Sequence, residues 1–531
     1  MSILYFNITI TILWLLSALA DYGQFCYVWQ FKEYRFDRLR DYGSTVSGKK
    51  FFHGWRVLKR PIIYLVLFLL LPENLKSLAG ALIAVFSVDL AYNLWAIAGH
   101  NLPRPKLTAK AAFLIILSLS IEGALLFFLF NQTIIFVVLA LRWFIFSSLA
   151  IAAKLPTGIA KLIYLKKAEN KLLKFKKIIV IGVTGSYGKT TVKNFLAQVL
   201  GEKYKVIITP ENINTEIGIA RFIIKNNFSE SDIFVVEMGT YKIGEIAAVC
   251  RMVKPKVGIL TVISDQHLSL LGNIKNTQTA KYELLRSLPA AGLAITNSDN
   301  PYCREFLGEL KCRVATFGAR DEFNPDCLIK NITAGETRIE FVASIKKNGQ
   351  LNISAPVLGS HNSLNIAPVI LVGLFLGLSE DEIISRSNQL KLPLKVLQTY
   401  AYGQSLILDD SYNANPDGFL AALDVLANCQ ERKKIVITRG MLELGSASQN
   451  WHETVGKRIG QVADELIIIS PDYVSALTAG AEGFKIKIKN MFEAKNLFDY
   501  LRQIKSEPNI ILLENRQPEI INREIKKVHS K

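Results

Sequence analysis

Hydrophobic residues are concentrated in the first third of this 531-residue chain. Apolar segments recur there with polar stretches between them: Ile3 to Val28, IIYLVLFLLL (62–71), Leu78 to Ile97, AAFLIILSLSIEGALLFFLF (111–130) and TIIFVVLALRWFIFSSLAIAA (133–153). Most of these segments have the length and composition of helices that cross a lipid bilayer. The pattern predicts a multi-span α-helical transmembrane domain of about five helices over residues 1–155.

The number of membrane crossings depends on residues 62–71. This run holds only ten residues between Pro61 and Pro72, whereas a spanning helix needs about 20. Five crossings put the basic stretches 32–60 and 99–110 in the cytoplasm together with the rest of the chain, as the positive-inside rule requires. Four crossings break this agreement, unless residues 62–71 enter the membrane and return. The first segment has no basic start and no clear cleavage site, so we expect a retained anchor in a multi-pass protein of the cytoplasmic membrane.

Charged residues are also unevenly distributed. The chain has a formal net charge of +18, but residues 1–177 hold 22 basic and 8 acidic residues, whereas residues 178–531 hold 41 and 37. The excess lies around the apolar segments, which argues against a nucleic-acid partner. The six cysteines lie far apart without CxxC spacing. We therefore expect free thiols in a reducing compartment, with no disulfide and no zinc site.

Seven lysines are interspersed with apolar residues in TGIAKLIYLKKAENKLLKFKK (157–177). The apolar positions have the spacing of an amphipathic helix on an anionic membrane surface, and they are Ile159, Leu162, Ile163, Leu172 and Leu173. A solvated linker helix explains the same composition. In either case residues 156–177 are a basic amphipathic linker at a domain boundary, and membrane lipid is a predicted partner.

Beyond this linker, β-branched apolar runs alternate with helical patterns. KIIVIGV, KVIIT, DIFVVEM and KVGILTVI are separated by segments such as TVKNFLAQVL and IGIARFIIK. This alternation is typical of parallel strands covered by helices. RIEFVASI and QLNISAPV predict a β insertion near the end of the first α/β domain, which we place at residues 178–396. A second series, from SLILDDS to NIILLE, predicts a Rossmann-like α/β domain at residues 397–531.

The segment IGVTGSYGKTT (181–191) leads from a buried-strand pattern through a glycine turn into a helix. In this setting backbone N–H groups and a helix N-terminus converge on phosphate groups. Gly185 and Gly188 let the backbone approach the phosphates, Lys189 supplies a positive charge, and Thr190 offers a hydroxyl to Mg²⁺. The strict GxxxxGK[ST] pattern fails because residue 183 is valine, so an ordinary strand–helix turn is the alternative. The phosphate interpretation makes residues 178–396 a central P-loop ATPase domain with a mostly parallel sheet.

Seven motifs in a fixed order connect residues 177–531 to a known family. They are TGSYGKTT (184–191), PENINTEIGIARFI (210–223), VVEMGTYKIGEI (235–246), ISDQHLSLLGNIKNTQTAKYELL (263–285), ITNSDNP (295–301), GSHNSLNIAPVI (359–370) and LDDSYNANPDGFLAAL (408–423). Together they resemble the Mur ligases, ATP-dependent enzymes that join amino acids or peptides to cell-wall precursors. The last motif and MLELG…H (441–452) most resemble the branch that adds D-alanyl-D-alanine to UDP-N-acetylmuramoyl-tripeptide.

The resemblance implies a reaction with ATP and two Mg²⁺ ions, in which the acceptor carboxylate becomes an acyl phosphate that an amine attacks. The implied catalytic residues are Lys189, Glu237, His267 and Lys281. The implied metal ligands are Thr190, Glu237, His267 and Lys281, the last as a carbamylated side chain. The implied nucleotide-binding residues are Gly185, Ser186, Gly188, Lys189, Thr190, Thr191, Asn362, Lys395 and Asp409. The implied substrate-binding residues are Asn212, Asn214, Thr215, Tyr412, Asn413, Asn415 and Arg516.

Each assignment has a structural alternative. Glu237 ends a strand pattern and fits an ordinary turn residue, His267 fits a structural histidine, and Lys281 lies on a helix, where lysine is common. His361 and Asn362 open an apolar helix and fit capping residues. The stretch DSYNANPDG is typical of a turn. His452 follows a helix start and fits a structural role equally well.

The sequence departs from the family pattern at several positions. Leu394-Lys395 stands where the family has Gly-Arg, which keeps the charge but loses the bidentate geometry of arginine. Arg439-Gly440-Met441 stands for Gly-Asp-Met, and Leu513-Glu514-Asn515-Arg516 for a segment like Lys-Gly-Ser-Arg. The apolar region stands where the family has the soluble domain that binds the UDP end of the substrate.

Three functions are compatible with these features. The first is ligation of D-Ala-D-Ala to UDP-MurNAc-tripeptide at the cytoplasmic face of the membrane. The second is the same chemistry on a lipid-linked muropeptide or another acceptor, because the apolar region replaces the domain that reads UDP. The third is a non-catalytic nucleotide-binding membrane scaffold, which the altered motifs permit. The predicted substrates are a cell-wall precursor and an amino acid or dipeptide, and the sequence identifies no protein partner.

Overall fold

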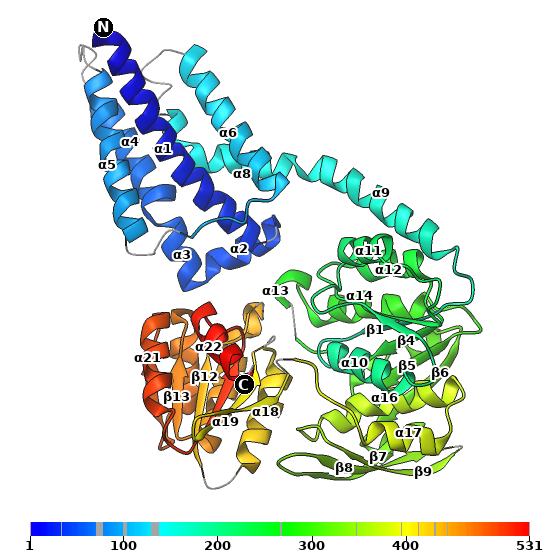
Figure 1. The fold of residues 1–531 in the computed structure, drawn as a ribbon. Coiled ribbons are helices and arrows are strands. Elements are labelled where there is room, and N and C mark those ends of the chain that lie inside the picture. The colour runs from blue at the N-terminus through cyan, green and yellow to red at the C-terminus, as the bar shows by residue number, and fades with distance from the viewer. Residues whose placement is uncertain are drawn as a thin grey trace. The chain divides into compact units, whose positions relative to one another are not determined.

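The computed structural model of this chain divides into two compact units, Met1–Ala160 and Lys161–Lys531 (Figure 1). It describes residues 2–32, 34–70, 78–98, 103–128, 137–265, 268–346, 348–394, 396–411, 414–429, 432–442 and 444–529. The division lies inside the predicted linker 156–177, because one helix, α9 (Lys154–Leu172), passes through the boundary.

The first unit is helical. Its other elements are α1 (Ser2–Phe31), α2 (Phe36–Ser44), α3 (Val46–Phe52), the π-helix η1 (Trp55–Lys59), α4 (Arg60–Leu70), α5 (Leu78–Ala98), α6 (Ala109–Phe128) and α8 (Arg142–Ala152). Among the residues described, two helical stretches are long and apolar enough to cross a bilayer, Ile8–Phe31 and Ala109–Phe127; Val85–Ile97 and Arg142–Ala152 are shorter apolar stretches. Residues 71, 129–130 and 133–136 of the predicted spans lie outside the described residues.

Each of the helices α5, α6 and α8 is linked to α1 through side-chain hydrogen bonds at two positions, and the order of these positions shows whether the helix runs parallel or antiparallel to α1. α5 and α8 run in the same direction as α1, and α6 runs in the opposite direction. The bonds are Ser17–Asp89 and Arg56 between Asp21 and Asn93 for α5, Trp14–Glu122 and Gln30–Lys106 for α6, and Arg142–Ser17 and Trp29–Ser147 for α8. The η1–α4 segment also opposes α1, since Arg56 contacts Asp21 whereas Tyr64 belongs to a small core against which Leu13 packs. Five described segments therefore alternate in direction.

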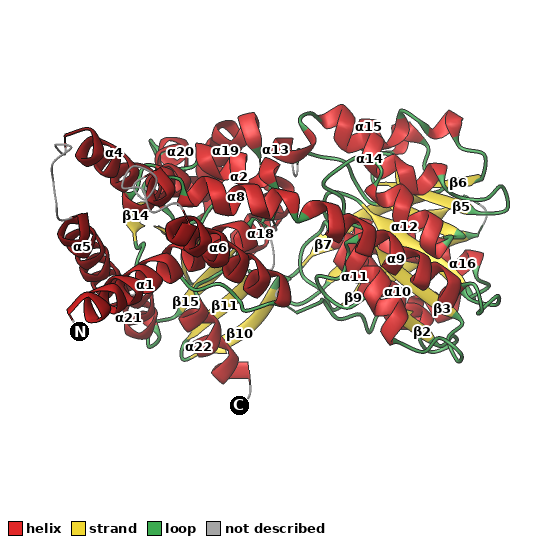
Figure 2. Cartoon of the chain, turned by 90° about the horizontal axis from the view of Figure 1, so that it is seen from above, coloured by secondary structure: helices red, strands yellow, loops and turns green. Residues whose placement is uncertain are grey.

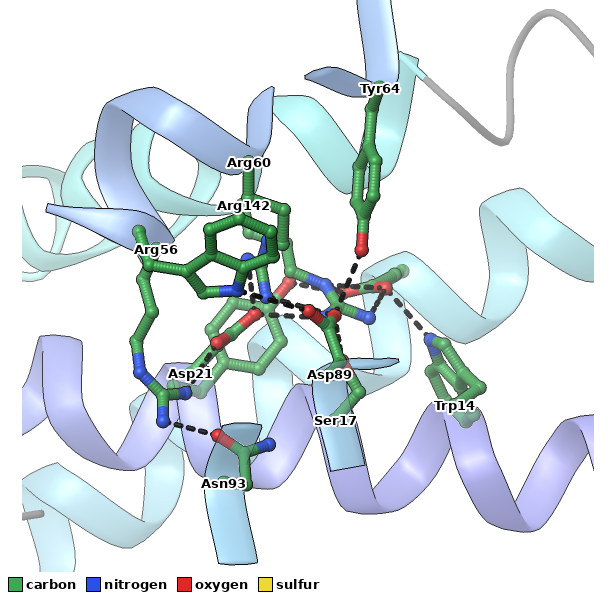
Figure 3. Close-up of polar contacts among 12 residues, drawn as sticks. Trp14, Ser17, Asp21, Arg56, Arg60, Tyr64, Asp89, Asn93 and Arg142 are labelled. Atoms are coloured by element: carbon green, nitrogen blue, oxygen red, sulfur yellow. Dashed lines mark hydrogen bonds and ion pairs between the residues drawn. The ribbon is translucent and has the colours of Figure 1, made fainter. Parts of the chain in front are cut away.

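Charged side chains occupy the interior of this unit (Figure 3). The buried charge network consists of three carboxylates and three guanidinium groups: Asp21, Asp89, Glu122, Arg56, Arg60 and Arg142. At its centre, Asp21 lies 2.8, 2.5 and 2.8 Å from nitrogen atoms of Arg56, Arg60 and Arg142. Every member is at most 5% exposed at the side chain, so the positive and negative charges balance one another away from solvent.

The outer surface of the same unit is apolar. Large hydrophobic side chains are exposed on α1, α5, α6 and α8, and they include Ile8, Ile12, Leu94, Trp95, Phe113, Ile116, Phe127 and Phe144. The unit therefore buries its charged side chains and exposes many large hydrophobic ones.

The second unit begins with a nine-stranded sheet in the order β2-β3-β1-β4-β5-β6-β7-β8-β9. Its strands are β1 (Ile179–Thr184), β2 (Val206–Ile208), β3 (Ile233–Glu237), β4 (Val257–Leu260), β5 (Leu293–Asn297), β6 (Arg313–Gly318), β7 (Cys327–Ala334), β8 (Ile339–Ile345) and β9 (Gly349–Ala355). The pairings from β2 to β7 are parallel, and β7, β8 and β9 pair antiparallel. The predicted β insertion is thus an antiparallel extension of the parallel sheet.

Helices cover both faces of this sheet (Figures 1 and 2). On one face lie α10 (Lys189–Leu200), α16 (Asn362–Phe375) and α17 (Glu380–Ser387), whose apolar side chains share one core with the strands. On the other face lie α9, α11 (Glu216–Lys225), α12 (Glu245–Val253) and α14 (Ile274–Arg286), which share a second core. β-Branched residues buried on both faces make these strands continuous apolar runs, as the sequence predicts.

A six-stranded sheet follows, in the order β10-β11-β15-β12-β13-β14. Its strands are β10 (Gln398–Tyr402), β11 (Ser405–Asp410), β12 (Lys433–Thr438), β13 (Glu465–Ile468), β14 (Lys487–Asn490) and β15 (Asn509–Glu514), and only β10 is antiparallel to its neighbour. The helices of this part are α18 (Pro416–Asn428), α19 (Ser448–Val462), α20 (Val474–Ala481), α21 (Ala494–Ile504) and α22 (Glu519–His529). The α/β prediction for both parts of this unit is confirmed. All six cysteines are free.

Candidate active site

The glycine turn after β1 leaves no space for side chains at two positions. Gly185 and Gly188 adopt φ values of +150° and +79°, which L-residues with side chains rarely adopt. A Cβ at Gly185 would collide with the Thr261 hydroxyl, and one at Gly188 would collide with Asn365 Oδ1. The turn therefore exposes backbone directly before the N-terminus of α10, an arrangement that suits a phosphate group.

Two lysine amines meet at one carbonyl oxygen of this turn. Lys189 Nζ and Lys281 Nζ donate to Gly185 O at 2.7 and 2.8 Å, and Lys189 also donates to Ser186 O at 3.0 Å. Lys281 comes from the distant helix α14 and is only 3% exposed. Burial, reinforced by the neighbouring Lys189 cation, lowers the pKa of Lys281 well below its usual range. The structure thus places next to the turn an amine that is readily neutral.

Glu237 ends β3 and is 2% exposed. Its Oε2 accepts hydrogen bonds from Thr190 Oγ1 (3.0 Å) and Lys193 Nζ (3.1 Å), and its Oε1 accepts one from Asn214 Nδ2 (3.3 Å). Lys193 is buried and is absent from the residues that the sequence identifies. The signal for it was the helical spacing, because a residue three positions after Thr190 lies on the same face of α10.

Oxygen ligands of this kind fit Mg²⁺, which prefers carboxylate and hydroxyl oxygens. Thr190 and Glu237 are adjacent, as expected for a shared ion, and Lys193 balances the carboxylate charge. Within the described residues, three or more histidine, cysteine, aspartate or glutamate side chains do not gather into a metal site. The predicted site residues His267, Lys395, Tyr412 and Asn413 lie outside the described residues.

Ser186 and Thr191 support the turn rather than facing outward. Ser186 Oγ accepts a hydrogen bond from the backbone N–H of Ser264 at 2.9 Å, and its own N–H donates to Val262 O at 2.7 Å. Thr191 is buried inside α10. The segment after β4 therefore fixes the shape of the turn.

The segment 210–215, called the acceptor loop below, holds the predicted substrate-binding residues Asn212, Asn214 and Thr215 and leads into α11. Asn212 is exposed with φ of +63°. Asn214 faces Glu237, and Thr215 caps α11 by accepting from the Gly218 N–H at 3.4 Å. The structure thus brings Asn214 to the predicted metal ligands, whereas Thr215 has a structural task.

Two other predicted contacts are used within the fold. Asn362 is fully buried, donates to Leu358 O at 2.6 Å and accepts from Asn365 Nδ2 at 2.8 Å. It therefore supports Asn365, whose Oδ1 lies against Gly188. Asn415 caps α18 by accepting from the Gly418 N–H at 2.9 Å. Asn362 thus has an internal supporting role and Asn415 a capping role, and the sequence left such structural roles open as alternatives to ligand binding.

The C-terminal sheet presents a group of carboxyl side chains at the ends of β11 and β15. Asp409 is buried and accepts from the Ser411 N–H at 3.0 Å. Asp410 and Glu514 are register partners on the adjacent strands. Burial raises the pKa of Asp410 to about 7 and raises the pKa of Glu514 well above its usual range. Near neutral pH this pair shares at least one proton. Arg516, two residues further on, is exposed.

We expect Glu514→Gln to make the protein more stable than the wild type at pH 8 by about 1–2 kcal/mol, because it removes a buried carboxyl group that is costly to ionise. The size follows from about 1.4 kcal/mol for each unit of pKa shift. Both folded-state pKa values are raised, so the contribution of this pair to stability is fully present below about pH 4 and is lost as the pH rises through about 7. The glutamine keeps a donor for Asp410 and removes one titrating group. Hydrogen exchange of β11 and β15 at pH 6 and pH 8 measures this, with the exposed Glu519→Gln as control. An unchanged pH dependence would contradict the shared proton.

His452 has a structural role. It is fully buried, its Nε2 accepts from the Met441 N–H at 2.8 Å, and its ring stacks on Tyr473 at a centroid distance of 4.2 Å. Burial lowers its pKa. Gly440, in the altered motif, has φ of +82° and packs against both rings. The change from Gly-Asp-Met to Arg439-Gly440-Met441 thus coincides with a turn that needs glycine at its second position.

Comparison with known proteins agrees with this arrangement. Residues 183–373 match the Mur ligase middle domain, and residues 395–517 match the Mur ligase glutamate ligase domain. The UDP-N-acetylmuramoyl-tripeptide–D-alanyl-D-alanine ligase of Synechocystis is 31% identical over 58% of this chain and 65% of its own length. The enzyme of the same name from Bacillus subtilis is 28% identical over 63% of this chain and 72% of its own length.

Solved structures agree with the fold. The MurF ligase of Thermotoga maritima in complex with ADP has a TM-score of 0.60 at 26% identity, covering 70% of this chain and 83% of the other. MurF from Acinetobacter baumannii has a TM-score of 0.62 at 24% identity, which concerns the fold alone. The chain spans slightly less than two thirds of the length of the Synechocystis relative. The two matched domains together cover more than half of the chain, in family order, and the chain therefore belongs to the Mur ligase family.

Proposed function

We propose that this protein is an ATP-dependent, Mur-type ligase of peptidoglycan precursor synthesis that adds D-Ala-D-Ala to UDP-MurNAc-tripeptide. The observation that carries the proposal is the convergence of Lys189 and Lys281 on the Gly185 carbonyl, beside the Thr190–Glu237 pair. Relatives from Synechocystis and Bacillus subtilis carry the name of this activity. The MurF ligase of Thermotoga maritima, which shares the fold, was solved in complex with ADP.

The reaction requires that two anions, the triphosphate of ATP and the acceptor carboxylate, lie next to each other, and residues of this chain serve to bring them together. A carboxylate is a poor leaving group, so the γ-phosphoryl group of ATP must first be transferred to it. The turn and Lys189 would hold the triphosphate, and Thr190 and Glu237 would hold Mg²⁺. When bound, two Mg²⁺ ions offset the repulsion between phosphate and carboxylate. Asn214 lies between the acceptor loop and Glu237, where it can orient the acceptor.

Lys281 is proposed to act as a carbamate. Its neutral amine attacks CO₂, a nitrogen–carbon bond forms, and one proton is released to solvent, which leaves an anionic carbamate. The carbamate would place a negative charge beside Lys189 and would supply oxygen ligands for the second Mg²⁺, together with His267. The lowered pKa of Lys281 supports the proposal, because only the neutral amine reacts.

The first unit is the membrane part of this protein. Its charged interior and apolar exterior suit a lipid environment, in which intramembrane charges face the bundle interior. Asp21 lies ten residues before the end of α1, Asp89 nine before the end of α5, and Glu122 thirteen after the start of α6. At about 1.5 Å per residue these positions lie about 13–20 Å from the helix ends, near the middle of a ~30 Å hydrocarbon layer.

This arrangement also explains the short apolar run 62–71. α4 begins at Arg60, inside the charge network, and its 11 residues extend over only about 16 Å. The π-helix η1 directly precedes α4 and carries Arg56 into the same charge network, so the apolar run does not reach the network alone. Five crossings then place the ligase domains in the cytoplasm.

A second candidate is the same chemistry on a lipid-linked muropeptide. It is favoured by the membrane-type unit that precedes the ligase domains. The test is phosphate release by the purified full-length protein with ATP, Mg²⁺, D-Ala-D-Ala and either UDP-MurNAc-tripeptide or a lipid-linked tripeptide. Turnover on the UDP-linked acceptor supports the first function, and turnover only on the lipid-linked acceptor supports the second. ATP binding without turnover on any acceptor would reject both and leave a non-catalytic scaffold.

A further inference from the structure

Helix α9 has one face that belongs to the ligase domain. Ala168 and Leu172 are buried in the same core as Ile219, Ile223 and Phe228 of the α11 region. The sequence-based expectation that Leu172 lies on the lipid-facing side of an amphipathic helix is therefore wrong. This face is filled by protein because the small Ala168 and the branched Leu172 pack directly against α11 and the residues that follow it.

Polar contacts connect α9 to both ends of α11. Near the start, Lys161 Nζ lies 2.7 Å from Glu216 Oε1. At the other end, Lys171 Nζ donates to Ile224 O and Asn226 O at 2.7 and 2.6 Å. Because Glu216 directly follows Thr215, the last residue of the acceptor loop, α9 holds the helix that carries this loop.

The opposite face of α9 and its extension is apolar and basic. Ile159, Leu162 and Ile163 are 63%, 67% and 62% exposed, and Leu173 is 46% exposed. These side chains recur at helical spacing on the side away from Ala168 and Leu172. The exposed lysines around them are Lys166, Lys167, Lys174, Lys176 and Lys177.

We propose that this outer face of α9 lies on an anionic lipid surface and that α9 thereby positions the acceptor loop for substrates at the membrane. The proposal rests on the membrane and ligase functions proposed above. Lysines beside exposed aliphatic side chains complement acidic head groups over an acyl layer. In addition, the apolar stripe begins only seven residues after α8 ends at Ala152, about 10 Å along a helix, so the chain has little length in which to leave the membrane.

The first test locates the lipid. The full-length protein, reconstituted in nanodiscs of phosphatidylglycerol and phosphatidylcholine, carries a photoreactive benzophenone residue at Ile163, at Phe113 on the apolar surface of α6, or at Ile332 on β7. We expect lipid adducts at residues 113 and 163 and no adduct at residue 332. An adduct at 113 without one at 163 would overturn the proposal. This outcome is independent of catalysis, so it is separate from a failure of the ligase assignment.

The second test addresses the acceptor loop. In phosphatidylglycerol nanodiscs, the double variant Leu162→Asp/Ile163→Asp should raise the KM for the tripeptide acceptor that supports turnover in the assay above at least five-fold. The KM for ATP should stay unchanged. Ile332→Asp is the control. Lys161→Met should have the same selectivity, because it removes the contact with Glu216 without changing the apolar stripe. Equal acceptor KM values in the wild type and both variants would overturn the positioning role.

Discussion

Replacement of Lys281 by alanine is expected to reduce amide-bond synthesis at least about a hundred-fold, the usual effect of removing one preorganised charge-stabilising group from an active site. Lys281 meets Lys189 at the Gly185 carbonyl, and as a carbamate it would hold the second Mg²⁺. ATP binding should change little, since the turn and Lys189 remain. The measurement is ADP and phosphate release with saturating substrates, alongside the dissociation constant for ATP.

The matched control is Lys275→Ala on the same helix. Lys275 is exposed and pairs with Glu305, so its removal should leave the rate unchanged. Carbon dioxide gives a second readout. Depleting CO₂ should slow the wild type, bicarbonate should restore it, and Lys281→Ala should respond to neither. Wild-type rates in Lys281→Ala would refute the proposed chemistry, whereas a loss of activity without any bicarbonate effect would refute the carbamate alone.

Replacement of Arg142 by methionine is expected to lower the free energy of unfolding of the first unit by about 3–5 kcal/mol, because it leaves buried carboxylates without their counter-charge. Arg142 bonds Glu122 at 2.7 Å, Asp21 at 2.8 Å and Ser17 at 2.8 Å, and it is 1% exposed. We expect the variant to lose monodispersity in detergent at a lower temperature than the wild type. Size-exclusion chromatography after a temperature series measures this.

A double variant makes this prediction specific to charge balance. Arg142→Met/Glu122→Gln leaves two arginines and two carboxylates in the network, so it should recover most of the lost stability. The exposed Arg104→Met controls for the loss of a cation and should behave like the wild type. If the double variant were as unstable as the single one, packing rather than charge would explain the effect.

Local sequence patterns predicted the strands, turn and helices of the ligase domains. Apolar β-branched runs specify strands that are buried on both faces, and a glycine turn before a helix specifies the 185–188 loop. These signals are local, so they survive without knowledge of the tertiary fold. The same locality explains why residues 62–71 fit no standard span: the run is short, and α4 begins at Arg60, whose partners Asp21 and Asp89 lie far away in the sequence.

The roles of single side chains depended on distant partners. Helical spacing placed Lys193 on the face of Thr190, but its partner Glu237, 44 positions along the chain, came only from the tertiary structure. Asn362 and Asn415 had the composition of ligand contacts, but neighbouring backbone and amide groups use them as internal supports. Asp21 and Glu122 appeared as isolated charges in apolar runs, although each one faces Arg142.

The order of residues is enough to specify the alternation of strands and helices, the position of the phosphate-type turn and the separation of an apolar, basic-flanked first third from two α/β parts. Contacts across the fold settle which charges neutralise one another and which face of α9 is buried. Hydrophobic period and turn chemistry act over a few residues, whereas charge pairing and burial depend on atoms brought together from far apart. The meeting of Lys281 with the turn across 96 positions follows from that second kind of information.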